Sequence, residues 1–440
     1  MNLTPREIVK FLDDYVIGQK DAKKIIAIAL RNRYRRMKLE KSLQDDIMPK
    51  NILMIGSTGV GKTEIARRLS KMMGLPFIKV EASKYTEVGF VGRDVESMVR
   101  DLAAASVNLV KAEQREKNCE KIDEYVKDKI IKKLLPPLPT GASEEKKADY
   151  EKSYEKMAAK LEHGDLDDLS IEIEVSENAL ESNPNLPPEM ANMQESFIKV
   201  IGISTRKSKK EMKVKDAKVA LKSEASEKVL DMESIKVEAV RRAQNEGIIF
   251  IDEIDKVAVS SGNSGRQDPS KEGVQRDLLP IVEGSSVSTK FGNIDTDHIL
   301  FIAAGAFHIS KPSDLIPELQ GRFPLRVELD SLDEAALCEI LTKPKNSLLK
   351  QYSALLKTEG VELEFSEDGV KAIAKFAAST NEKVEDIGAR RLHTIMEKVL
   401  EDISFEADKF KGQKIVVDEK LVSEKLAGIA SDEDLAKYIL

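Results

Sequence analysis

The sequence predicts an α/β protein built on a parallel sheet, with a charged, mainly helical insert and a small, mainly helical domain at the end. Short apolar runs typical of buried strands recur at residues 52–55, 248–251 and 298–306. Between the first two runs, residues 111–236 change to a composition rich in Lys and Glu and broken by prolines. The predicted domains are residues 1–110 together with 237–330, the insert 111–236, and the C-terminal domain 331–440.

Length and composition limit the possible functions. The chain has 440 residues and a net charge of -7, so its overall charge does not indicate a nucleic-acid-binding protein. Cys119 and Cys338 have no C-x-x-C partner, and we therefore expect neither a disulfide framework nor a zinc site. The N-terminus lacks the apolar core of a signal peptide, and no apolar run is long enough for a membrane helix. We expect a soluble cytoplasmic protein with no nucleic-acid or membrane partner.

Residues 56–63 read G-S-T-G-V-G-K-T and match the G-x-x-x-x-G-K-[ST] pattern of phosphate-binding loops. The glycines allow a tight turn that directs backbone N–H groups at phosphate oxygens. Lys62 can reach the outer phosphates, and the Thr63 hydroxyl can bind Mg²⁺. The alternative is a glycine-rich turn in an ordinary strand–helix unit. The strand-like run before the motif and the helix-like residues 64–73 after it favour binding of a nucleoside triphosphate.

A pair of acidic residues follows the apolar run 248–251. Asp252 and Glu253 are therefore expected at the carboxyl end of a buried strand, where ligands bind in open α/β sheets. Asp252 is suited to the Mg²⁺ shell, and Glu253 can orient and deprotonate a hydrolytic water. Surface carboxylates are common, but this pair in a protein with a phosphate loop favours hydrolysis of the bound nucleotide.

Three further positions leave two interpretations open. Ile17 is either a core residue beside a turn or an apolar wall for an adenine ring. Phe90, flanked by Gly89 and Gly92, either fills a core or contacts a ligand, and its residue type alone favours the core. Arg322 lies in a constrained turn before a strand, where it either forms a local ion pair or reaches the γ-phosphate of a neighbouring subunit.

Helix signals appear near both ends of the chain. Thr4 and Glu7 predict a capping box at the first helix. A basic amphipathic helix is predicted from Lys20 to about Lys41. We expect its arginines on a solvated face, with phosphate or a neighbouring subunit as the alternative partner; they are Arg31, Arg33, Arg35 and Arg36. Arg390 begins a later helix against the helix dipole, which suggests an anionic partner such as a bound nucleotide.

The insert and the C-terminus carry weaker signals. Residues 171–175 alternate at strand period, and the rest of the insert has the composition of exposed helices. Its composition does not separate a solvated spacer from an arm that binds a partner. The chain ends in Tyr438-Ile439-Leu440, which is apolar where polar, frayed residues are usual.

Five motifs then fall in order along the chain: GSTGVGKT, TEVGFVG, IIFIDEIDK, PSDLIPELQGRFP and IGARRLHT. Together they resemble the AAA+ unfoldase family that serves HslUV (ClpYQ) proteases, over nearly the whole chain. The resemblance implies an AAA+ P-loop NTPase domain that forms a homohexameric ring and binds ATP or ADP with Mg²⁺. It also implies two partners, which are unfolded or tagged protein substrates and a ring of the threonine peptidase HslV (ClpQ).

The resemblance also implies roles for individual residues. Nucleotide binding is implied for Ile17, Gly59, Val60, Gly61, Lys62, Thr63, Glu64, Asp252, Glu318 and Arg390, with Thr63 and Asp252 at the metal. Catalysis is implied for Glu253 and for Arg322 acting on a neighbour's nucleotide. A substrate-gripping pore loop is implied for Gly89, Phe90, Val91 and Gly92, with Phe90 where Tyr is more usual. Peptidase docking is implied for Tyr438, Ile439 and Leu440. Ala303-Ala304-Gly305 offers no polar side chain, and no role is assigned there.

Other functions explain less of the sequence. A nucleic-acid motor could share the Asp-Glu motif, but the acidic net charge and the lack of basic grooves with interleaved aromatics argue against it. A ClpX-type unfoldase usually carries a Cys-rich zinc module, which this chain lacks. A scaffold that only activates a peptidase would not need Glu253 and Arg322.

Overall fold

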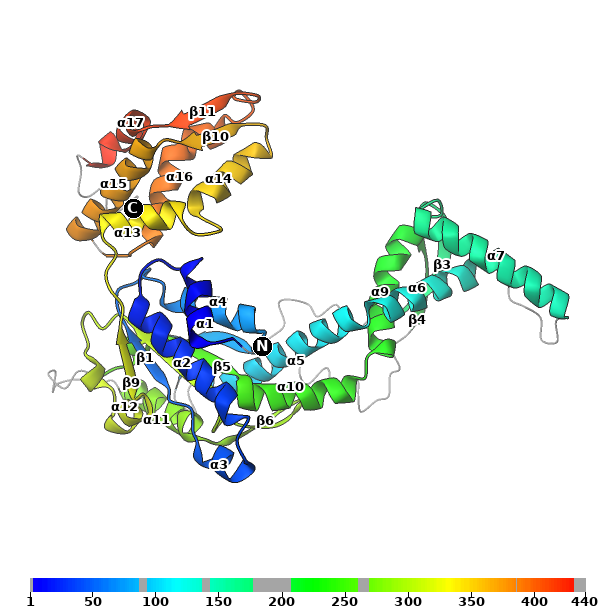
Figure 1. Cartoon of the computed structure of the whole chain (residues 1–440), viewed down its shortest axis with the longest axis horizontal. Coiled ribbons are helices and arrows are strands. Elements are labelled where there is room, and N and C mark those ends of the chain that lie inside the picture. The colour runs from blue at the N-terminus through cyan, green and yellow to red at the C-terminus, as the bar shows by residue number, and fades with distance from the viewer. Residues whose placement is uncertain are drawn as a thin grey trace. The chain divides into compact units, whose positions relative to one another are not determined.

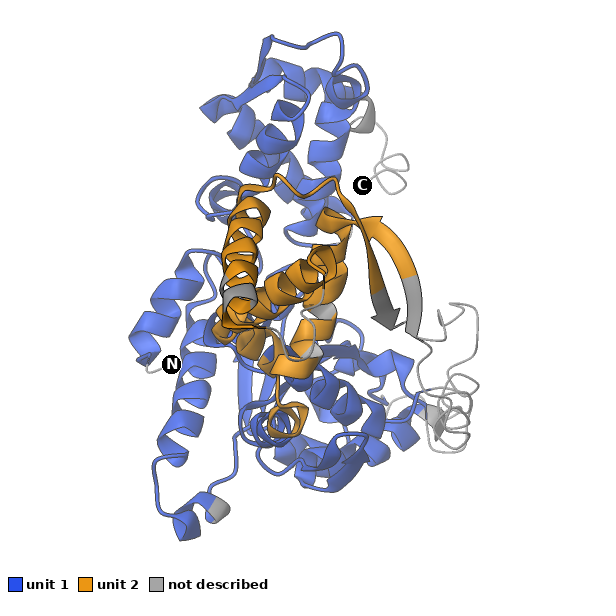
Figure 2. Cartoon of the chain, turned by 90° about the vertical axis from the view of Figure 1, so that its right-hand side faces the viewer, with its two compact units in different colours: residues 1–109, 237–440 blue, residues 110–236 orange. Residues whose placement is uncertain are grey.

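The computed structural model describes residues 3–86, 93–136, 143–176, 207–259, 269–384 and 386–430. The chain falls into two compact units, residues 1–109 with 237–440 and residues 110–236, which are coloured separately in Figure 2. The predicted pore loop, Gly89 to Gly92, and the predicted docking residues, Tyr438 to Leu440, lie outside the described residues. None of the helices described is both long enough and apolar enough to cross a membrane.

A five-stranded parallel sheet forms the centre of the first unit, in the order β2-β5-β8-β1-β9. Its strands β1, β5 and β9 are labelled in Figure 1. The strands are β1 (Ile52–Ile55), β2 (Phe77–Glu81), β5 (Ile248–Asp252), β8 (Leu300–Gly305) and β9 (Leu325–Glu328). The predicted parallel sheet is therefore confirmed. Because parallel strands end at the same edge, the phosphate loop after β1 and the acidic pair after β5 meet there, with only β8 between them.

Both faces of the sheet are covered by apolar cores, which explains why strands β1, β5 and β8 read as continuous apolar runs. Successive side chains alternate between two cores. Leu53 and Ile249 pack into one core with residues of helices α5 (Glu96–Lys117), α10 (Met232–Glu246) and α11 (Pro269–Glu283). Ile52, Met54 and Phe250 pack into the other with helices α1 (Pro5–Asp13), α2 (Lys20–Arg36) and α4 (Lys62–Met73).

The N-terminal helices confirm one expectation and correct another. The capping box at α1 is present, because Thr4 N donates to Glu7 Oε2 at 2.7 Å and Glu7 N donates to Thr4 Oγ1 at 3.4 Å. Helix α2 ends at Arg36, and a separate short helix, α3, spans Lys41–Asp46. The predicted single helix to about Lys41 was therefore too long.

The expectation of a solvated arginine face on α2 was wrong for Arg33 and Arg36, which are buried. The Arg33 guanidinium donates to the carbonyl oxygens of Asn245 at 2.8 Å, Glu246 at 3.3 Å and His298 at 2.9 Å. The carbonyls of Asn245 and Glu246 lie at the end of α10, where a helix leaves carbonyls without intrahelical partners. Burial lowers the pKa of Arg33 to about 10, within the range where it stays charged at neutral pH.

The C-terminal part of the first unit has its own apolar core. It contains α13 (Glu334–Thr342), α14 (Leu348–Lys357), β10 (Glu362–Phe365), α15 (Glu367–Lys383), α16 (Arg390–Phe405), β11 (Lys414–Val417) and α17 (Glu419–Ala430). Strands β10 and β11 pair in parallel. The first unit also contains α12 (Pro317–Arg322) and an antiparallel hairpin of β6 (Ser286–Thr289) and β7 (Gly292–Asp295), which the sequence did not predict.

The second unit combines helices with one strand pair. Its helices are α6 (Cys119–Leu134), α7 (Glu144–His163) and α9 (Val214–Val229), and its strands β3 (Ser170–Ser176) and β4 (Lys207–Lys213) are antiparallel. The alternation at residues 171–175 therefore predicted a strand correctly. Ile171 and Ile173 are buried in the core of this unit, whereas Glu172 between them is exposed.

Candidate nucleotide site

The phosphate loop connects β1 to α4 and depends on glycine. Gly59 and Gly61 have φ values of 77° and 102°, in the left-handed region where a side chain causes strain. Lys62 begins α4 and is 8% exposed. Its ammonium donates to the carbonyl oxygens of Ser57, at 2.7 Å, and Gly56. The lysine is thus held over its own loop, next to the backbone that would hold a phosphate.

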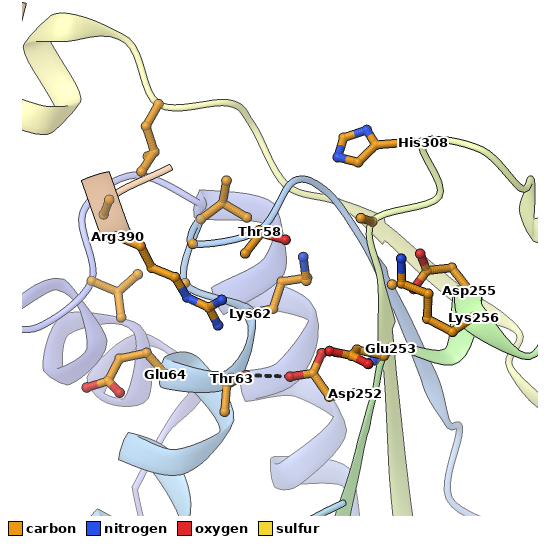
Figure 3. A pocket seen from close by; sticks show the side chains of 18 of the residues that line it. Thr58, Lys62, Thr63, Glu64, Asp252, Glu253, Asp255, Lys256, His308 and Arg390 are labelled. Atoms are coloured by element: carbon orange, nitrogen blue, oxygen red, sulfur yellow. Dashed lines mark hydrogen bonds between the residues drawn. The ribbon is translucent and has the colours of Figure 1, made fainter. Parts of the chain in front are cut away.

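Charge in this loop is arranged to attract an anion. Burial lowers the pKa of Lys62, and the nearby Arg390 guanidinium lowers it further, while Asp252 and Asp255 act in the opposite direction. Figure 3 shows the Arg390 side chain extending toward Lys62 and Thr63 from the other side of the loop. A phosphate between Lys62 and Arg390 would remove the repulsion between the two cations.

The acidic pair lies at the same edge. Thr63 Oγ1 lies 3.4 Å from Asp252 Oδ2, the contact drawn as a dashed line in Figure 3. Lys79 on β2 forms an ion pair with the same carboxylate at 2.7 Å. Glu253 has a φ of 57°, unusual for a residue with a side chain, and accepts a hydrogen bond from Ser83 Oγ at 3.1 Å. Such backbone strain is often found at functional sites.

The phosphate loop, the acidic pair and Arg390 line a cavity of about 970 Å³. The predicted residues that line it are Ile17, Gly59, Val60, Gly61, Lys62, Thr63, Glu64, Asp252, Glu253 and Arg390. Glu64 is also paired with Arg67 and Arg68 of its own helix, so its carboxylate is already engaged. Both interpretations of Ile17 remain compatible with this position, because a partly buried residue can wall a cavity and support a core.

Arg390 reaches the cavity because α16 begins against the phosphate loop. Ala389 N donates to Gly59 O at 3.3 Å. A Cβ added at Gly59 would lie 2.1 Å from Ile387 O, and one at Gly388 would lie 2.6 Å from Thr58 O. Two glycines therefore let the two backbones approach each other directly.

Arg322 and Glu318 are not among the described residues that line this cavity. Both are on α12, with exposed side chains. Arg322 forms an ion pair with Glu283 at 2.8 Å, which is the local alternative that the sequence left open. Its action on a neighbour's nucleotide stays a prediction.

The cavity also contains residues that the sequence did not single out: Lys271, His308, Leu332, Ile340 and His393. His308 follows the end of β8, and Figure 3 shows its side chain at the top of the view, above Lys62 and the acidic pair. It comes three residues after Ala303-Ala304-Gly305, the triplet to which no role was assigned. A polar side chain so close to the end of a buried strand was the signal that could have identified it. His393 is one helical turn after Arg390, so the i, i+3 spacing was a usable signal.

The donor atoms present fit a magnesium ion shared with a nucleotide. Among the described residues, no group of three or more His, Cys, Asp or Glu side chains is arranged to hold a metal. Thr63 and Asp252 instead offer one hydroxyl and one carboxylate. Mg²⁺ commonly binds one or two protein oxygens together with substrate phosphates and waters.

Comparisons with known proteins agree with this geometry. Residues 52–122 match the ATPase family associated with various cellular activities (AAA), and residues 169–326 match the AAA domain (Cdc48 subfamily). The chain is 74% identical over its whole length, and over the whole relative, to the ATP-dependent protease ATPase subunit HslU of Campylobacter jejuni. It is 64% identical to the HslU of Helicobacter pylori, covering all of this chain and 99% of the relative. The chain therefore belongs to the HslU family of ATP-dependent protease ATPase subunits.

Proposed function

We propose that this chain hydrolyses ATP in a ring of six copies and uses the cycle to unfold proteins and thread them into an HslV-type threonine peptidase, which it also activates. One observation carries the proposal. A phosphate loop, an acidic pair and a helix-start arginine meet at one cavity in a member of the HslU family. The presence of both Glu253 and Arg322 favours a motor over a nucleotide-gated scaffold.

In the proposed cycle, backbone N–H groups of residues 59–64 bind the phosphates, and Lys62 exchanges the carbonyl oxygens of its loop for phosphate oxygens. When bound, Mg²⁺ would be held by Thr63 and Asp252 and would neutralise charge on the outer phosphates. Glu253 accepts the proton of the attacking water, and Ser83 Oγ orients its carboxylate by donating a hydrogen bond to Oε2. Arg390 binds the phosphates from α16, so the C-terminal helices respond to the nucleotide.

A second copy would complete the site. The exposed side chains of Arg322 and Glu318 are available to a neighbour, and Arg322 would exchange its pairing with Glu283 for a γ-phosphate. An arginine supplied in this way stabilises the charge of the transition state. This arrangement explains why an arginine predicted to act on the nucleotide lies outside its own cavity.

Substrate and peptidase contacts are proposed from the motifs alone. Gly89-Phe90-Val91-Gly92 would grip unfolded polypeptide in the pore of the ring, and Phe90 retains the apolar surface that grip requires. Tyr438-Ile439-Leu440 would insert into the peptidase. We propose cytoplasmic action without nucleic-acid or membrane partners.

The proposal is tested by measuring ATP hydrolysis with and without an unfolded protein, and separately with DNA. Stimulation by unfolded protein alone is expected. A parallel assay compares activation of an HslV-type peptidase by the full chain and by a chain lacking residues 438–440. Stimulation by DNA alone would support a nucleic-acid motor instead, and equal activation by the shortened chain would contradict the docking role.

A further inference from the structure

Gln19 is a buried polar residue beside the nucleotide cavity, and it has no role in the proposed hydrolysis. It follows the cavity-lining residues Tyr15 to Ile17, is 4% exposed, and has a φ of 55°. A buried glutamine in a left-handed backbone conformation is costly unless its surroundings hold it there.

The Gln19 side chain forms a two-point contact with the backbone of a single distant residue. Its Nε2 donates to Asp330 O at 2.8 Å, and Asp330 N donates to its Oε1 at 3.0 Å. Both functions of the amide are satisfied, as expected for a buried polar group. Asp330 lies in the linker between β9 and α13, the yellow segment of Figure 1.

That linker touches the nucleotide site at two other points. Leu329 N donates to Ile55 O at 2.8 Å, and a Cβ added at Gly56 would lie 3.0 Å from Leu329 Cβ. Leu332 lines the cavity and packs against both the C-terminal core and the core on the α4 side of the sheet. The linker is therefore in contact with the start of the phosphate loop, the cavity wall and both cores.

The segment before Gln19 is also fixed from within. Lys23 is 1% exposed, and its ammonium donates to Val16 O at 2.5 Å and Asp13 Oδ1 at 2.6 Å. Lys345, in the connection after α13, donates through its backbone to Asp14 O at 3.1 Å and pairs with the Asp14 carboxylate at 2.6 Å. A ligand bound against residues 15–17 would therefore contact a segment that is hydrogen-bonded on both sides. Gln19, two residues after Ile17, joins this segment to Asp330.

We propose that Gln19 is a positioning residue that couples occupancy of the cavity wall at residues 15–17 to the conformation of the linker at Asp330. The inference rests on the nucleotide binding of the proposed function. Gln19 itself does not contact the nucleotide. Its amide transmits the position of the wall to the backbone that leads into α13.

The test is hydrogen exchange of the full chain with and without saturating ADP, in wild type and in Gln19→Glu. The variant keeps the size and the acceptor oxygen but replaces the donor to Asp330 O with a carboxylate. In wild type, ADP should slow exchange both in the phosphate loop and at residues 330–332. In Gln19→Glu, ADP should still slow exchange in the phosphate loop, but slowing at residues 330–332 should fall by about tenfold, as expected for loss of a buried hydrogen bond.

Controls separate this inference from the proposed function and from misfolding. Gln351→Glu makes the same change at an exposed glutamine that also donates to a backbone carbonyl, and should behave as wild type. If Gln19→Glu does not fold, Gln19→Gly removes the amide at a position whose φ glycine tolerates. Equal slowing at residues 330–332 in the folded variant and wild type overturns the coupling. Lack of slowing in the wild-type phosphate loop overturns the nucleotide site itself.

A kinetic measurement adds a readout that simple destabilisation would not produce. The kcat for ATP should fall in Gln19→Glu while the dissociation constant for ADP changes little, because the wall still binds the base but no longer moves the linker. A parallel loss of ADP affinity with unchanged kcat would mean that Gln19 only shapes the wall, and would also overturn the proposal.

Discussion

Lys62 shows how a single residue depends on its surroundings for its role. Its ammonium is buried, has a lowered pKa and is bound to the carbonyl oxygens of Gly56 and Ser57. A triphosphate offers the same ammonium negatively charged acceptors in place of neutral ones, so the ammonium gains the attraction between opposite charges. The exchange favours the bound state.

We expect Lys62→Ala to lose nucleotide binding by at least about tenfold, because a hydrogen bond to a charged group contributes about 1.5–3 kcal/mol. Titration with a fluorescent ADP analogue measures this loss. Lys71→Ala, an exposed lysine on the same helix outside the cavity, is the matched control and should bind as wild type. Unchanged affinity in Lys62→Ala would show that this lysine does not hold the phosphates.

At the scale of elements, the contact between the phosphate loop and the start of α16 is made by backbone atoms. The close approach at Gly59 and Gly388 leaves no room for a side chain. Any movement of the loop on binding a nucleotide is therefore transmitted to α16 without an intervening side chain.

Gly59→Ala should separate these two backbones and weaken nucleotide binding, since its Cβ would lie 2.1 Å from Ile387 O. Gly412→Ala is a matched control, because its φ of 78° is close to the 77° of Gly59 and its Cβ would meet nothing within 4 Å. Both variants carry a left-handed penalty of about 1–2 kcal/mol. Only Gly59→Ala should lose ADP affinity by calorimetry, and a similar loss in both would mean that strain elsewhere is responsible.

The buried arginine of α2 predicts a stability effect. Arg33→Met should lower the stability of the first unit by about 2–3 kcal/mol, because it leaves three partly buried carbonyl oxygens without their charged donor. Thermal unfolding followed by circular dichroism should show a lower Tm. Arg35→Met, at an exposed position of the same helix, should change stability by less than about 0.5 kcal/mol. Equal Tm values for the two variants would argue against the capping role of Arg33.

These elements also show how far the sequence alone predicts the structure. Strands β1, β5 and β8 were predictable because each is a buried apolar run. The phosphate loop and the acidic pair were predictable because their chemistry requires those residues in that order. The burial of Arg33 was not, because its carbonyl partners lie more than 200 residues later in the chain. The β6–β7 hairpin was missed because Ser286, Ser288 and Thr289 make its first strand polar.

The cavity wall was predictable only in part. Ile17 was identified because it lies upstream of the phosphate loop in the sequence, and Arg390 because it lies at the start of a helix. Leu332 and Ile340 reach the cavity from the linker and α13, and ordinary apolar residues carry no local signal of such a position. The pairing of Gln19 with Asp330 spans 311 positions and has no sequence pattern that would predict it.

For the whole molecule, the property to test is the proposal that one copy completes the site of another. Glu253→Gln keeps Arg322 but should bind ATP without efficient hydrolysis. Arg322→Ala keeps the acidic pair but should lack the neighbour's charge, a loss of about 10³–10⁵ in rate for known arginine fingers. Each variant alone should therefore be nearly inactive.

Mixing the two variants in equal amounts should restore ATP hydrolysis. In randomly mixed closed rings, about a quarter of the sites would combine an intact acidic pair with a neighbour's Arg322. Steady-state hydrolysis of the mixture, with each variant alone as reference and nucleotide binding checked in both, measures this. A mixture as inactive as its components would place the action of Arg322 within its own chain or rule it out.

In the proposed function, ATP hydrolysis at this cavity drives the unfolding of proteins for a partner peptidase. The most direct measurement follows the fluorescence of a folded, tagged fluorescent protein in the presence of this chain, an HslV-type peptidase and ATP. We predict steady loss of fluorescence with wild type and ATP, and none with Glu253→Gln or with ADP. Loss of fluorescence at the wild-type rate with Glu253→Gln, or without ATP, would contradict the account.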